Sequence, residues 1–164
     1  MSNATPPVIE MIVLGVIESL WNLNATNYSF QPEDVLRRIL PEETQVVDGL
    51  IVVDQTQAEE INEDGYTDSG DVGCLVEKRQ IVNVCVCCIP EIEQPIDQMV
   101  NERASDVVRV LLADRTFGGQ ALATTRCLGT QPWLTADGGF AGFIVPLELH
   151  YRHKEIDPTF NGVD

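Results

Sequence analysis

Residues 143–152 read FIVPLELHYR, and this stretch is the clearest secondary-structure signal in the chain. Apolar and polar side chains alternate along it, which is typical of a β-strand with one buried side. The residues predicted to face the core are Phe143, Val145, Leu147, Leu149 and Tyr151, and the others are Ile144, Pro146, Glu148, His150 and Arg152. Because proline lacks a backbone N–H, Pro146 predicts that this strand lies at a sheet edge or carries a bulge.

Three earlier segments are also predicted to be β-structure. Leu50 to Val53 is a short apolar run, and Cys74 to Ile89 is a long one enriched in β-branched residues. We expect these two to pair antiparallel. A strand with mixed faces is expected over 121–128, and a glycine-rich connection over 129–139.

Two segments, 6–23 and 95–113, carry apolar side chains at helical spacing. The short segment 35–40 is a further helical candidate. Glu10 and Glu18 interrupt the first apolar run, which is also too short to span a bilayer. We therefore interpret it as a core helix and expect no membrane association.

The order helix, strand, strand, helix, strand, strand predicts an α+β fold. We expect a four-stranded antiparallel sheet with two main helices on one face, broadly ferredoxin-like, in a single domain over 1–164. A long acidic loop at about 54–73 and a flexible C-terminal tail at about 157–164 are expected outside its packed core. The other sheet face then needs water or a partner.

The chain has 26 acidic and 10 basic residues, a formal net charge of -16 at pH 7. Such a field repels nucleic acid and anionic lipid, so an ordinary DNA-binding or membrane-binding module is disfavoured. The hydrophobic content of 44% is too high for a disordered acidic chain. The composition therefore predicts a folded, strongly acidic protein.

Cysteines and histidines are the candidates for metal or thiol chemistry. Cys85 and Cys87 are predicted to face one side of their strand and Cys88 the other, and His150 and His153 diverge likewise. A tetrahedral zinc site would need a distorted strand, so buried, reduced thiols are the favoured interpretation. We predict no enzyme activity and no catalytic, cofactor-binding or metal-binding residue; a small Cys/His metal-binding domain or thiol-dependent enzyme is the alternative.

The acidic segment and a glycine-rich turn are the other candidate ligand sites. Asp64, Asp68 and Asp71 are spaced like part of a calcium-binding loop, but Leu75 stands where the closing acidic ligand belongs. A solvated charge run is the better interpretation. Residues 137–142 read DGGFAG, lack the lysine of a phosphate-binding loop, and are predicted to form a hairpin turn.

Several motifs in the C-terminal part of the chain resemble a known family. They are DVVRVLLADRT at 106–116, Gly118-Gly119, Gly129-Thr130, ADGG at 136–139 with Gly142, VPLELHYR at 145–152 and Asp157-Pro158. On these motifs, over roughly residues 95–158, the chain is similar to small phage neck and tail-completion proteins. Among them it is most similar to the tail terminators of long-tailed bacteriophages.

The resemblance implies a structural virion protein of the tail and neck, assembled in the host cytoplasm. Such a protein forms a homo-oligomeric ring, usually a hexamer, that caps the tail tube protein and presents a surface to a neck or head-completion protein. The sheath protein is a further partner if the tail is contractile, and the genome passes through without specific binding. A head-completion or connector protein of the same assembly is the first alternative, and a small-molecule-binding ferredoxin-like module is another.

Exposed loops are the natural contact elements of such a ring. Trp133 is the predicted anchor, with packing over its own hairpin as the alternative. We expect Asp137 and Phe140 to contribute from the same loop. Three carboxylates of the acidic loop complete the predicted interface: Glu59, Glu60 and Asp64.

Overall fold

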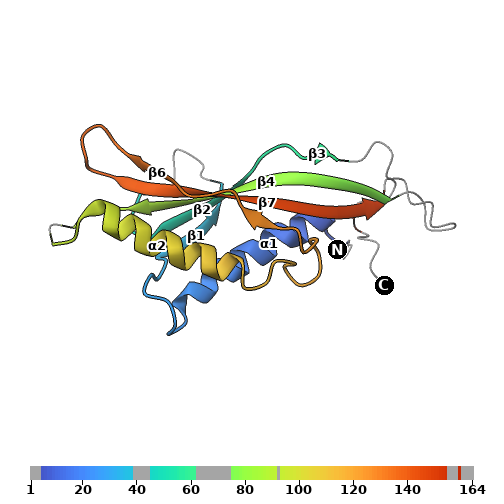
Figure 1. Cartoon of the computed structure of the whole chain (residues 1–164), viewed down its shortest axis with the longest axis horizontal. Coiled ribbons are helices and arrows are strands. Elements are labelled where there is room, and N and C mark those ends of the chain that lie inside the picture. The colour runs from blue at the N-terminus through green and yellow to red at the C-terminus, as the bar shows by residue number, and fades with distance from the viewer. Residues whose placement is uncertain (1–4, 39–44, 62–74, 92, 155–158, 160–164) are drawn as a thin grey trace.

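The computed structural model describes residues 5–38, 45–61, 75–91, 93–154 and 159, which form one sheet and two α-helices (Figure 1). The elements in chain order are α1 (Val8–Trp21), the 3-10 turn η1 (Asn22–Asn24), β1 (Asp34–Arg37), β2 (Leu50–Gln55), β3 (Glu59–Glu60), β4 (Leu75–Cys88), α2 (Ile96–Leu111), β5 (Arg126–Cys127), β6 (Gln131–Leu134) and β7 (Ala141–Lys154). The predictions of an α+β fold and of two main helices are confirmed.

Within the described residues the sheet has seven strands, in the order β1-β2-β4-β7-β5, with β3 beside β4 and β6 beside β7. β4 and β7 are each 14 residues long and pair antiparallel from end to end. β2 pairs antiparallel with β4, as predicted, but β1 runs parallel to β2. The prediction of a four-stranded, wholly antiparallel sheet is therefore wrong. Parallel neighbours need a long connection, and residues 38–49 supply it.

Segment 35–40, expected as a helical candidate, instead contains most of β1. Val35 is buried in the core, and its N–H donates to the Asp34 carboxylate at 2.8 Å. Arg38, with a φ of 54°, ends the strand, and its N–H donates to the Val53 carbonyl oxygen at 3.1 Å. A helix this short has little stability of its own, so pairing with β2 decides the conformation.

The segments that flank β7 also differ from expectation. Of the expected strand 121–128 only Arg126–Cys127 is a strand, and the connection 129–139 contains β6. Pro146 predicted that β7 lies at an edge or carries a bulge. The edge is wrong, because β4 pairs with one side of β7 and β5 and β6 with the other. On the β4 side the register runs through Pro146 without a break. The Pro146 carbonyl oxygen accepts the Leu128 N–H at 2.9 Å. The N–H and C=O of a strand residue point to the same side of the strand. The side of Pro146 that lacks an N–H therefore faces the gap between β5 and β6.

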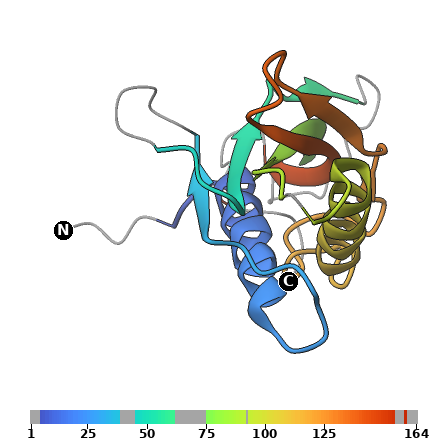
Figure 2. The ribbon, with the colours of Figure 1, turned by 90° about the vertical axis from the view of Figure 1, so that its left-hand side faces the viewer.

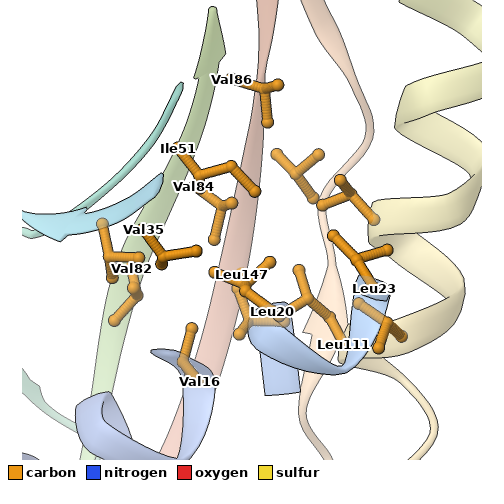
Figure 3. Close-up of a cluster of buried hydrophobic side chains, with 14 of the residues drawn as sticks. Val16, Leu20, Leu23, Val35, Ile51, Val82, Val84, Val86, Leu111 and Leu147 are labelled. Carbon is orange, nitrogen blue, oxygen red and sulfur yellow. The ribbon is translucent and has the colours of Figure 1, made fainter. Parts of the chain in front are cut away.

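Both helices cover the same face of the sheet, where α1 and α2 lie side by side (Figure 2). The predicted inward face of β7 is buried there together with alternate residues of β2 and β4. Figure 3 shows Leu20 and Leu23 of the α1–η1 segment converging with Leu111 of α2 on Leu147 of β7. Burial of this apolar surface fixes the helices and leaves the opposite sheet face for other contacts.

The expected acidic loop is partly strand. Asp54 belongs to β2, and Glu59–Glu60 is β3. Residues 62–74 lie outside the described residues, as does the expected tail 157–164 apart from Thr159.

Candidate interaction surface

The hairpin between β6 and β7 brings together three of the predicted contact residues, Trp133, Asp137 and Phe140. In its turn, the Thr135 N–H donates to the Phe140 carbonyl oxygen at 2.9 Å. Asp137 accepts hydrogen bonds from the Thr135 hydroxyl at 2.6 Å and from the Gly139 N–H at 3.0 Å. These bonds, that of Thr135 above all, hold the pKa of Asp137 below its usual range. The turn is thus shaped by its own side chains.

Trp133 lies on β6 opposite Gly142 of β7. Its ring packs so close to Gly142 that a Cβ there would overlap the ring and the Val86 carbonyl oxygen. Much of the indole therefore packs against its own hairpin, and Trp133 is only partly exposed. A role for Trp133 between molecules stays a prediction.

A groove of about 340 Å³ lies between β6 and the first turns of α2. Its lining is mostly apolar: Ile96, Val100, Pro132, Trp133, Leu134 and Ala141, with Asp97 and Asn101. Leu134 is 60% exposed at this groove, and Phe140 is also exposed. In Figure 1 the hairpin lies at one end of the long β4–β7 pair, on the same end as the start of α2. Exposed apolar side chains beside a groove are typical of a protein-binding surface.

The sheet face away from the helices carries a buried carboxylate, Glu148, whose side chain is 7% exposed. It accepts a hydrogen bond from Arg126 Nε at 2.9 Å and lies 3.2 Å from His150 Nε2. Arg79 of β4 approaches its other oxygen at 4.0 Å. Burial raises the pKa of Glu148, but the hydrogen bonds and charges of Arg126 and His150 outweigh it and lower the pKa. The ionised carboxylate thereby attaches the two-residue strand β5 to β7.

The described cysteines are free thiols: Cys85, Cys87, Cys88 and Cys127. As predicted, Cys88 is buried under the helices, whereas Cys85 and Cys87 lie on the other sheet face. Burial raises the pKa of all four, that of Cys127 to about 11. A protonated thiol is a weak nucleophile and a weak metal ligand. In the described part of the chain, no three His, Cys, Asp or Glu side chains are grouped to hold a metal ion.

The predicted carboxylates of the acidic loop do not join the hairpin residues. Glu59 and Glu60 of β3 lie opposite Arg79 and Lys78 of β4, and Glu59 forms an ion pair with Arg79. Cys88 of β4 pairs with Ala141, next to the hairpin. Arg79, which pairs with Glu59, lies nine residues from Cys88 along β4, a distance of about 30 Å. Asp64 lies outside the described residues.

The groove itself, with Ile96, Val100 and Leu134, was not predicted from the sequence. No periodicity marks it, because it forms only where β6 folds back beside α2. An exposed Leu128, close to β5, was missed for a similar reason: single exposed leucines are common and carry no pattern.

None of the helices in the described ranges has the length and apolar character needed to cross a membrane. No protein-family model matches the chain, and no curated protein matches it.

Proposed function

We propose that this protein is a non-enzymatic structural component of a bacteriophage tail, with a tail-terminator-like fold. As a terminator it forms a ring of six copies that caps the tail tube, stops its growth and meets the neck or head-completion protein. The observation that carries the proposal is the hairpin surface. Exposed Leu134 lines an apolar groove, and exposed Phe140 lies in the same hairpin, which suits association of copies better than turnover of a small substrate.

The architecture supports assembly because both α-helices of the described residues lie on the same sheet face (Figure 2). Glu148, Arg126, His150 and Arg79 lie on the other face, where their ion pairs make a structured but hydrated surface. Such a face remains available to neighbours or to water.

The margins formed by β1 and β6 favour contact between copies through side chains over pairing of these edge strands. In β1 the outward Val35 N–H is already bonded to the Asp34 carboxylate. In β6, successive N–H groups point alternately toward β7 and away from it. The Thr135 N–H bonds toward β7, so the backbone at position 132 faces away from β7, and there Pro132 has no N–H to donate. Both margins are therefore poor templates for an added strand.

The acidic charge supports a channel through which DNA slides. A ring of six chains multiplies the net charge of -16 sixfold and repels phosphates. Six arginines have ion-pair partners within the chain, namely Arg37, Arg79, Arg103, Arg109, Arg126 and Arg152. These cations are already partly neutralised, so they attract the phosphate backbone less than unpaired arginines do.

The experiment measures the mass of the purified chain by light scattering, alone and with tail tubes grown from the tube protein of the same phage. Negative-stain images record the tube ends and lengths. We expect rings at tube ends and arrested growth, and we expect Leu134→Asp to abolish both while Leu14→Asp, an exposed position on α1, does not. Tubes that grow unchanged contradict the terminator. Rings that bind a head-completion protein but ignore tubes support the neck-connector alternative instead.

A further inference from the structure

Cys85 and Cys87 form a pair of thiols on the sheet face away from the helices. They are two residues apart on β4, so their side chains project to the same face and their Cα atoms lie about 6.6 Å apart. Both side chains are half-buried, whereas Cys88 is buried under the helices. The pairing of β4 with β7 runs unbroken through both positions, which fixes this spacing.

The spacing of the two thiols suits a bridging metal ion better than a disulfide. A disulfide requires Cβ atoms about 3.5–4.5 Å apart, closer than those of two side chains that project in parallel from such positions. Two metal–sulfur bonds of about 2.3 Å each, arranged in a line, place the sulfur atoms about 4.6 Å apart. Rotation about the Cα–Cβ bonds tilts the two sulfur atoms toward each other. One ion can therefore join them without a change in the strand.

The surroundings of the pair are mostly apolar. Cys85 lies opposite Val52 of β2 and Ile144 of β7. Cys87 lies opposite Gly142 of β7, which has no side chain. Because Val52 is buried and both thiols are only partly exposed, a strongly hydrated ion would lose much of its water at this position.

The ligand set decides which metal fits. In the part of the chain that the structure describes, no three His, Cys, Asp or Glu side chains are grouped to hold a metal ion, so the two thiols stand as a pair. Zinc takes four ligands in a structural site, and calcium and magnesium take oxygen ligands. Thiolates select soft ions, and among these Cu(I) is monovalent and is satisfied by two sulfur atoms in a line.

We propose that Cys85 and Cys87 bind one Cu(I) ion between their sulfur atoms. Burial raises the pKa of both thiols, and the charge of Asp54 adds to this for Cys85, so both are protonated at neutral pH. Two protons therefore pass to solvent as the two sulfur–copper bonds form, and no electron is transferred. The sequence disfavours a tetrahedral zinc site on one strand, but a linear Cu(I) site needs no distortion of the strand. This inference is independent of the proposed function.

The test titrates the full-length chain with the Cu(I) complex of bicinchoninate, without oxygen and with ascorbate present. Loss of the colour of the complex measures the transfer of copper to the protein. We expect one tightly bound Cu(I) per chain. Cys85→Ser and Cys87→Ser should each weaken binding by at least about 100-fold, because loss of a residue that merely supports a ligand already costs roughly 10–100-fold. A parent that takes no copper from the complex overturns the proposal.

The matched control is the double variant Cys74→Ser with Cys127→Ser. Cys127 is another half-buried free thiol, and Cys74 lies outside the described residues. This variant should bind Cu(I) like the parent. Circular dichroism establishes that each variant is folded. Copper binding that survives unchanged in Cys85→Ser or Cys87→Ser, or that is lost in the folded control, overturns the assigned ligands.

Three measurements on the parent decide the site even where a serine variant fails to fold. X-ray absorption at the copper edge should find two sulfur ligands, and three or more overturn the two-thiol site. Light scattering should give the same mass with and without Cu(I), and copies linked by copper overturn a site within one chain. Zn(II) titrated against a chelating dye should bind no more tightly to the parent than to Cys87→Ser, and zinc binding that needs Cys87 contradicts the choice of Cu(I).

Discussion

Replacing Asp106 by alanine is expected to lower the free energy of unfolding by about 2–4 kcal/mol. Asp106 lies on α2 and is buried. Its Oδ2 accepts three hydrogen bonds from the segment after η1: from the Ser29 N–H at 2.9 Å, the Ser29 hydroxyl at 2.8 Å and the Phe30 N–H at 3.1 Å. This carboxylate therefore attaches α2 to the chain that leads into β1.

The magnitude follows from the donors that lose their acceptor. The buried Phe30 N–H loses its acceptor, and a buried donor left unsatisfied costs roughly 1–3 kcal/mol. The Ser29 N–H, whose bond is part-buried, loses a hydrogen bond to a charged group, which adds about 1 kcal/mol. The Ser29 hydroxyl can turn to water and adds little. Alanine has a higher helix propensity than aspartate, which offsets up to about 0.7 kcal/mol. Asp106→Asn keeps one acceptor oxygen, so its loss should be smaller.

Urea unfolding followed by circular dichroism measures the difference, and thermal unfolding should show a fall of roughly 5–15 °C in Tm for a chain of this length. Glu102→Ala is the matched control, because Glu102 is an exposed carboxylate on the same helix, and its hydrogen bonds from Gln94 and Gln98 lie at the surface. It should change stability by less than about 0.5 kcal/mol. An Asp106→Ala variant as stable as this control refutes the reasoning.

The same variants test a pH dependence. Burial raises the pKa of Asp106, but hydrogen bonds from Phe30 and Ser29 and the charge of Arg109 outweigh it and lower the pKa below the usual value of about 4. A lowered folded-state pKa stabilises the fold above the unfolded-state pKa, and this contribution is lost as pH falls through the folded-state pKa. The stability difference between the parent and Asp106→Asn should therefore be largest near neutral pH and shrink below about pH 4.

Three further predictions concern other parts of the fold. Gly142→Ala should leave little folded, soluble protein by circular dichroism, because the added Cβ overlaps the backbone of β4, whereas Gly139→Ala in the exposed turn should fold normally. Cys127 should react with a disulfide reagent at pH 8 far more slowly than free cysteine, because burial raises its pKa to about 11. Peptide mass spectrometry measures the rate of labelling, and a rate equal to that of free cysteine would contradict this prediction. Arg103→Met should cost about 1–3 kcal/mol in urea unfolding, because Asp48 loses two hydrogen bonds of 2.8 and 3.0 Å, and an unchanged midpoint would contradict this.

The long elements of the fold were predictable from the sequence because their periodicity spans several turns or residue pairs. Segments 95–113 and 143–152 illustrate this: their apolar faces are the ones buried in the core. The short strands β1, β5 and β6 were not predictable, since two to four residues carry no period and their conformation depends on pairing with a distant strand. The expectation of an edge at Pro146 failed for the same reason. Pro146 fits inside the sheet because two separate short strands, β5 and β6, lie beside β7.

The candidate surface was predictable only in part. Trp133, Asp137 and Phe140 were identified as members of one turn region, and the structure places them in one hairpin. The exposure of Leu128 and the position of Leu134 at the groove depend on tertiary neighbours, which no local sequence pattern reveals. The alternation along β7 likewise predicts that Glu148 faces away from the core. Glu148 is nevertheless buried, because β5 brings Arg126 over it.

The blunted margins at Pro132 and Asp34 bear on how selective this protein is about its neighbours. An open strand edge accepts almost any extended segment, since its backbone groups are the same in every protein. Recognition that depends on side-chain shape and charge discriminates between sequences, and a few substitutions can redirect it. A chain with such margins is less prone to unspecific strand pairing with other sheet proteins, and substitutions of surface side chains can give it a new partner while its sheet stays unchanged.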